Sequence, residues 1–112
     1  MENCIFCKIA SGEIPKKPEE IKFNNERFLA FLDIHPKSLG HTVLIPKAHY
    51  PWFQDLPDDL YHELFAVVKE MVPQLKQEYD ADYIHLSIVG KDVPHAHVHL
   101  IPRKLNDHGQ EL

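Results

Sequence analysis

Three histidines alternate with apolar residues in the stretch VPHAHVHLIPR, which runs from Val93 to Arg103. Successive side chains of a β-strand point to opposite faces of the sheet, so His95, His97 and His99 would share one face. The opposite face would carry Ala96, Val98 and Leu100. We therefore expect a strand over Ala96–Ile101 that packs its apolar face against a helix and displays its histidine face.

Four further segments have strand composition and are bounded by turn residues. They are Ile21–Asn24, Arg27–Ile34, His41–Ile45 and Tyr83–Val89. Asn24-Asn25-Glu26 suits a hairpin turn between the first two of them, and Gly90-Lys91-Asp92 suits a turn before the last strand.

One long amphipathic helix is predicted from Asp58 to Tyr79, because its apolar residues recur at steps of three and four. Pro73 lies inside this pattern and should kink the helix or end it early, since proline removes a backbone donor and clashes with the preceding turn. A short helix is expected over Ile5–Ala10, closed by Gly12 and Pro15.

Five strands in mostly hairpin succession, with one long helix before the last pair, predict an α+β fold. The sheet would be mainly antiparallel, with the long helix on one face. We expect a single domain over residues 1–112, since this length suits one hydrophobic core.

The chain has a formal net charge of -5, from 12 Lys plus Arg and 17 Asp plus Glu. A nucleic-acid partner is not expected, because no basic stripe is present to neutralise a phosphate backbone. No apolar run reaches the length of a membrane span, and the first residues do not resemble an export signal. We expect a cytoplasmic protein with no membrane partner.

The three histidines of the stretch can hardly bind one metal from a regular strand. At about 3.3 Å per residue, the Cα atoms of His95 and His99 would lie roughly 13 Å apart, whereas zinc needs nitrogens at about 2.0–2.1 Å. The histidines should therefore have different roles, although half-buried structural histidines would give the same pattern. The pair Cys4 and Cys7 is interpreted as two thiolate ligands or a redox motif, because a disulfide closing so short a loop stabilises little.

The sequence resembles the histidine triad family along nearly its whole length. His95-Ala96-His97-Val98-His99-Leu100-Ile101 matches the family signature, in which three histidines alternate with apolar residues. Asn3–Pro15, Ala30–Ile34 and Gly40–Tyr50 match its other landmarks in the same order.

This resemblance implies a nucleotide-binding hydrolase or transferase that acts on nucleoside phosphoramidates or dinucleoside polyphosphates. The middle histidine, His97, would be the nucleophile and would form a nucleotidyl-histidine intermediate. Neutral imidazole is available at pH 7 for such an attack. His99 would hydrogen-bond a nonbridging phosphate oxygen, Asp33 would accept the ribose hydroxyls and Ile34 would pack on the base. His41 either lines the same cleft or is a core histidine.

Relatives with the N-terminal C-x-x-C pair imply a structural zinc for this chain. Its ligands would be Cys4, Cys7, His49 and His95. Two sulfurs and two nitrogens form the closed tetrahedral site that is typical of a structural zinc.

The loop before the triad departs from the family pattern. Relatives carry a longer glycine-rich loop that often ends G-Q-[ST]-V, whereas this chain has Gly90-Lys91-Asp92-Val93. Lys91 stands near the glutamine position, and Asp92 replaces the hydroxyl residue. A carboxylate there would repel a phosphate unless its charge is offset, or it would simply cap a turn. Relatives often carry an asparagine on the strand before this loop. This chain has no asparagine there, and Ser87 is the polar residue nearest to that position.

The same residues are also compatible with two other functions. The first is a zinc-stabilised nucleotide-binding adaptor with little turnover, which the altered loop favours. The second is a metal-binding module, which would need more than one metal per chain. The resemblance also implies a homodimer through the long helix and an adjacent strand, although packing on the chain's own sheet explains the same apolar residues. These are Tyr61, Leu64, Phe65 and Val68.

Overall fold

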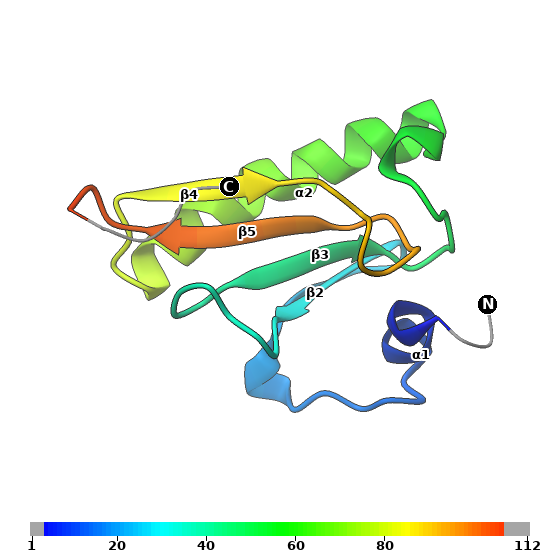
Figure 1. The fold of residues 1–112 in the computed structure, drawn as a ribbon, viewed down its shortest axis with the longest axis horizontal. Helices are drawn as coiled ribbons and strands as arrows, with labels where there is room; N and C mark the ends of the chain where they lie inside the picture. Colours follow the sequence, from blue (N-terminus) through cyan, green and yellow to red (C-terminus); the bar gives the residue numbers. More distant parts are fainter. Residues whose placement is uncertain (1–3, 107–112) are drawn as a thin grey trace.

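A five-stranded antiparallel sheet forms the centre of the molecule (Figure 1). The computed structural model describes residues 4–106, in which the strands follow the spatial order β1-β2-β3-β5-β4. The strands are β1 (Ile21–Asn24), β2 (Phe28–Leu32), β3 (Thr42–Pro46), β4 (Tyr83–Ser87) and β5 (Val98–Arg103). The helices are α1 (Ile5–Ser11) and α2 (Asp58–Glu78), with short 3-10 turns at Pro18–Glu20 and Phe53–Asp55. The predicted α+β fold is confirmed.

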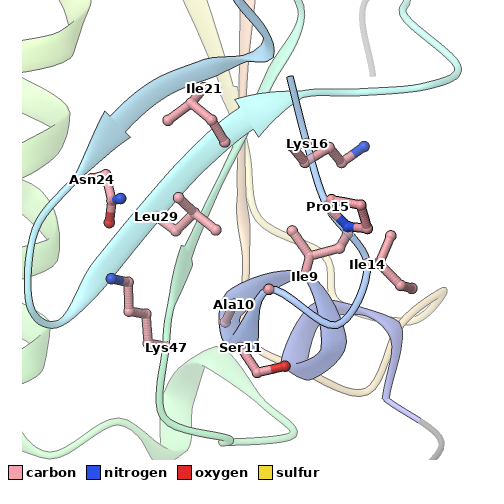
Figure 2. Close-up of a pocket in the computed structure, with 11 residues that line it drawn as sticks. Ile9, Ala10, Ser11, Ile14, Pro15, Lys16, Ile21, Asn24, Leu29 and Lys47 are labelled. Atoms are coloured by element: carbon pink, nitrogen blue, oxygen red, sulfur yellow. The ribbon is translucent and has the colours of Figure 1, made fainter. Parts of the chain in front are cut away.

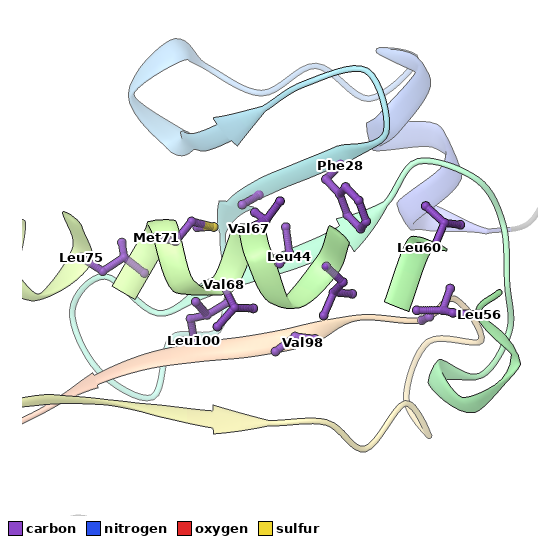
Figure 3. Close-up of a cluster of buried hydrophobic side chains, with 13 residues drawn as sticks. Phe28, Leu44, Leu56, Leu60, Val67, Val68, Met71, Leu75, Val98 and Leu100 are labelled. Carbon is purple, nitrogen blue, oxygen red and sulfur yellow. The ribbon is translucent and has the colours of Figure 1, made fainter. Parts of the chain in front are cut away.

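Helix α2 covers one face of this sheet and forms the larger core (Figure 3). Its buried stripe packs against alternate residues of β2, β3 and β5, as the helical and strand periods require. The stripe consists of Leu60, Leu64, Val67, Val68, Met71 and Leu75. Ala96, Val98 and Leu100 belong to the same core, so the predicted apolar face of the triad segment is confirmed.

Helix α1 packs on the opposite face of the sheet. Phe28 and Ala30 of β2 belong to the core under α2, whereas the alternating Leu29 and Phe31 pack with Ile9 of α1. The histidine face is therefore covered at His95 and His97, where our expectation that it is displayed was wrong, whereas His99 is half-buried. His95 is fully buried and His97 is only 4% exposed.

Strand β5 begins at Val98, two residues later than predicted, so His95 and His97 precede the strand. They end a loop over residues 88–97, called loop 88–97 below. Ala96 N–H donates to the Tyr50 carbonyl at 2.6 Å, and His95 N–H donates to the Val93 carbonyl at 2.7 Å. These bonds replace regular strand pairing at this point of the chain.

Helix α2 continues through Pro73 to Glu78, so proline does not end it as one of our two alternatives expected. Pro73 is exposed, while Met71 and Leu75 on either side of it are buried in the core. Tertiary packing thus compensates for the backbone hydrogen bond that proline removes. None of the helices within residues 4–106 is both long and apolar enough to cross a membrane.

Candidate functional site

Two cysteines and two histidines converge beneath α1. Cys4 Sγ lies 3.3 Å from His95 Nδ1, Cys7 Sγ lies 3.2 Å from His49 Nδ1, and Cys7 Sγ lies 3.5 Å from His95 Nδ1. All four potential ligand atoms lie within 4.8 Å of one another. A tetrahedral zinc with its usual bond lengths separates a sulfur and a nitrogen by about 3.5 Å, so the cluster has the dimensions of a zinc site.

The tautomer of His95 suits a metal ligand. Its Nε2 lies 2.8 Å from the Pro46 carbonyl oxygen, which can only accept a hydrogen bond, so the ring proton is on Nε2. Nδ1 then carries the free lone pair and points toward the sulfurs. A ligating histidine commonly donates its other nitrogen to a carbonyl in this way. Burial lowers the pKa of His95, which keeps the ring neutral for coordination.

The cysteine pair is placed by the first turn of α1. Cys4 caps the helix, because its Sγ accepts the Cys7 N–H at 3.4 Å. Burial, together with the neighbouring Cys4 thiol, raises the pKa of Cys7 to about 11. Two thiolates this close therefore need a cation to balance their charge, and a zinc ion would supply it.

His97 presents the geometry of a nucleophile. Its Nδ1 lies 2.7 Å from the carbonyl oxygen of His95, so Nδ1 carries the proton and Nε2 carries the lone pair. The rings of Phe6 and His99 meet it edge-on, with ring centroids 5.1 Å and 5.0 Å away. The imidazole is thus held in one orientation with one basic nitrogen.

A chain of hydrogen bonds connects His99 to the main chain through His41. Lys37 N–H donates to His41 Nδ1 at 3.0 Å, so the proton of the neutral His41 ring is on Nε2. His41 Nε2 lies 2.9 Å from His99 Nδ1 and donates to it. His99 must then carry its own proton on Nε2, as a donor for a ligand.

The imidazole rings of His41 and His99 are both neutral near pH 7. Burial, with the neighbouring His97 and His41, lowers the pKa of His99 to about 4. Burial is also the main cause that lowers the pKa of His41. Sequence reasoning left His41 open between a cleft residue and a core histidine, and its contact with His99 is what connects it to the triad.

Asp33 completes this second cluster. Its Oδ2 lies 3.5 Å from His41 Nε2 and 3.7 Å from His99 Nδ1, while Oδ1 accepts the His35 N–H at 2.8 Å. The three side chains are close enough to surround an ion. Metal binding at His41 Nε2 would, however, require a proton on Nδ1, where the Lys37 N–H already points. The cluster is therefore a hydrogen-bonding relay and not a second metal site.

The other predicted site residues lie around these clusters. Ser87 is buried on β4, directly opposite His99 in the sheet register. Ile34 is 68% exposed just beyond β2, next to Asp33. Lys91 and Asp92 are exposed on loop 88–97, which leads into the triad. Their predicted roles depend on a bound nucleotide and stay predictions.

A cavity of about 230 Å³ opens elsewhere, between the end of α1 and the hairpin of β1 and β2 (Figure 2). Its floor is apolar, with Ile9, Ile21 and Leu29, and Lys47 points into it. No histidine lines this cavity, so it is separate from the two clusters.

Comparisons with known proteins agree with this geometry. The HIT domain matches residues 15–106. An uncharacterised HIT-like protein of Methanocaldococcus jannaschii is 42% identical over 93% of this chain and 81% of its own length. An adenosine 5'-monophosphoramidase of Schizosaccharomyces pombe is 36% identical over 96% of this chain and 79% of its own length.

A solved structure also resembles this one. It is a zinc-bound histidine triad family protein from Mycobacterium smegmatis, with a TM-score of 0.88 and 30% sequence identity. The match covers 97% of this chain and 81% of that one. Zinc is therefore compatible with the fold as well as with the cluster of Cys4, Cys7, His49 and His95.

Proposed function

The chain belongs to the HIT domain family, and from this premise we propose that it cleaves nucleoside phosphoramidates or dinucleoside polyphosphates through a nucleotidyl-histidine intermediate on His97. One observation carries the proposal. The Nδ1–H of His97 is bonded to a carbonyl, which leaves Nε2 as a fixed lone pair. The monophosphoramidase of S. pombe supports the substrate class.

The reaction divides one displacement into two easier ones. In the first step His97 Nε2 attacks the α-phosphorus and forms a phosphorus–nitrogen bond. The leaving group departs with its bonding electron pair, and a leaving amine takes up a proton from water. In the second step water attacks the same phosphorus and loses a proton to the solvent, the bond to Nε2 breaks with its electron pair returning to Nε2, and a nucleoside monophosphate is released.

His99 and Asp33 would bind different parts of the substrate. His99 donates from Nε2 to a nonbridging phosphate oxygen, where charge develops during attack. His41 makes that donor available because it occupies His99 Nδ1. Asp33 accepts the ribose hydroxyls, and the exposed Ile34 packs on the base. Ser87, Lys91 and Asp92 adjoin the phosphates from β4 and loop 88–97.

Zinc would be held by Cys4, Cys7, His49 and His95, and its contribution is structural. These ligands would connect α1 to the segment that follows β3, through His49, and to the segment that precedes β5, through His95. The chemistry on phosphorus is left to His97, whose Nε2 takes no part in that cluster.

Trapping of the intermediate tests the proposal. The protein is mixed with adenosine 5'-phosphoramidate, quenched within one turnover and analysed by intact mass and peptide mapping. We expect an added adenylyl group on His97 and release of AMP. An adduct on another residue, or AMP release that does not require His97, would contradict the mechanism.

A nucleotide-binding adaptor is the alternative function, and Asp92 on loop 88–97 favours it. Its exposed carboxylate stands where relatives place a hydroxyl group beside the phosphates. AMP binding by calorimetry, with no AMP release from several nucleotidyl substrates, would identify the adaptor. Replacement of Asp92 by Ser would then be expected to restore turnover.

A second copy of the chain is the partner that we propose. Leu64 and Val68 are buried in the chain's own core, whereas Phe65 on α2 is 43% exposed. Leu86 is exposed on β4, an edge strand of the sheet, and Ile88 is exposed at the start of loop 88–97, directly after that strand. Edge pairing of two β4 strands would cover these apolar residues. Light scattering after gel filtration measures the mass that decides this.

A further inference from the structure

Phe6 lies between the two cysteines of the proposed zinc site, on the first turn of α1. Its ring meets the imidazole of His95 edge-on, with centroids 5.9 Å apart and planes 80° apart. It meets the imidazole of His97 in the same way at 5.1 Å and 80°. One aromatic ring therefore contacts both a proposed metal ligand and the proposed nucleophile.

The second contact that orients His97 also comes from the zinc cluster. The acceptor for its Nδ1–H is the carbonyl of His95, and the ring of His95 is itself fixed by the Pro46 carbonyl. His97 is thus oriented from two sides by residues that carry or adjoin the ligands. A displacement of Phe6 or of the His95 carbonyl would let the ring of His97 rotate, and Nε2 would then point in another direction.

Phe6 also packs against Phe31. These two rings meet edge-on at 5.7 Å, and Phe31 is buried on β2. Helix α1 has only seven residues, and a helix this short has little stability of its own. Its place on the sheet depends on tertiary contacts and on any ion that joins Cys4 and Cys7 to His49 and His95.

We propose that Phe6 is a positioning residue for His97, and that zinc bound to Cys4, Cys7, His49 and His95 orients the nucleophile through it. The ion fixes the turn that carries Phe6, and Phe6 fixes the imidazole of His97. The inference rests on the proposed function only in taking His97 as the nucleophile. It assigns to the metal an effect on turnover in addition to its structural role.

The first test follows the ring of His97 by nitrogen NMR of histidine-labelled protein, with its signals assigned by their loss in His97→Gly. In the zinc-loaded protein we expect a single tautomer with the proton on Nδ1. In zinc-free protein and in zinc-loaded Phe6→Ala we expect a mixture of both tautomers. Identical His97 signals in loaded and zinc-free protein would overturn the proposal.

The second test separates positioning from substrate contact. Phe6→Ala should keep one zinc per chain and lower kcat about ten-fold, because an edge-on aromatic contact has about that influence, with a smaller change in KM. Phe6→Leu should recover part of the loss, and Lys8→Ala on the same helix should match the unmodified protein. A raised KM at unchanged kcat would show that the ring only contacts substrate, and would contradict the proposal.

Further outcomes keep the two proposals distinguishable. If Phe6→Ala loses zinc, the role of Phe6 is tested with Phe6→Leu instead. The role of zinc is tested by comparing the His97 NMR signals of the unmodified protein with and without zinc. If His97→Gly turns over normally, the proposed function fails, whereas the tautomer measurement still reports whether zinc orients the ring.

Discussion

His41 and His99 lie 58 positions apart in the sequence and share a hydrogen bond of 2.9 Å between Nε2 of His41 and Nδ1 of His99. Because the Lys37 N–H occupies the other nitrogen of His41, this bond has a fixed direction. The remaining proton of His99 must point away from the pair. A main-chain amide therefore determines which nitrogen of His99 carries its proton.

Replacement of His99 by Asn tests this donor. Asn can still accept the His41 hydrogen bond, but it lacks the Nε2–H. We expect kcat to fall about 10²-fold with little change in KM, as for other donors that act on developing charge. Steady-state kinetics on adenosine 5'-phosphoramidate measures both constants. A loss confined to KM would show that His99 acts in binding alone.

The pH dependence of stability should also change in His99→Asn. The pKa of His99 is lowered to about 4 in the folded protein, against an ordinary value of about 6.5 when unfolded. The unfolded chain therefore binds more protons between these values, and stability is lost as pH falls from 6.5 toward 4. The loss for this residue is up to about 3 kcal/mol.

Urea unfolding at pH 7 and pH 4.5 measures this effect. The unmodified protein should lose more stability between the two values than His99→Asn does. Release of zinc at the lower pH affects both proteins alike. Equal losses in the two proteins would contradict the shifted pKa.

Replacement of His97 by Gly should abolish turnover and retain nucleotide binding. Loss of the nucleophile should lower kcat on the order of 10³-fold or more, since no other described residue offers an equivalent nitrogen at this position. AMP binding by calorimetry and AMP release by chromatography give the two measurements. His62→Ala, which removes an exposed imidazole from α2, is the matched control and should behave as the unmodified protein.

Removal of zinc should destabilise the protein. An ion present at a thousand times its dissociation constant stabilises the fold by about 4 kcal/mol, and each kcal/mol shifts the Tm of a domain this size by about 4–8 °C. We expect chelation or Cys7→Ser to lower the Tm by at least about 15 °C. Ser11→Ala on the same helix is the control, and metal analysis should give one zinc per chain. A chelator-resistant Tm would argue against a structural ion.

Replacement of Gly40 by Ala should destabilise the turn before His41. Gly40 has φ 90°, and an added Cβ would lie 2.5 Å from ring atoms of Tyr79. The strained backbone and the overlap together should cost about 2–4 kcal/mol. Gly12→Ala isolates the backbone part, because Gly12 has φ 85° and nothing within 4 Å of an added Cβ. Chemical unfolding of both variants measures the difference.

The elements of the fold could be read from the sequence because their signals are local. The alternation of Ala96, Val98 and Leu100 predicted a buried strand face, and the helical period from Leu60 to Leu75 predicted α2. The helical pattern persisted through one disruptive residue, Pro73, because several buried side chains outweigh one lost backbone hydrogen bond. The beginning of β5 was misplaced because a hydrogen bond from Ala96 to Tyr50 ends the regular pairing.

The sequence by itself indicated the helices, the strands and a mainly antiparallel sheet, since these follow from side-chain periodicity, and its resemblance to the histidine triad family indicated the candidate site residues. Only the tertiary structure decided which histidine contacts which partner. Cys4 reaches His95 across 91 positions of sequence, and His41 reaches His99 across 58. Such contacts depend on how the sheet and α1 pack, and each one fixes where a ring carries its proton. The chemistry of an imidazole is set by that proton, which is why one repeated residue type could take the three roles that we propose, those of ligand, nucleophile and donor.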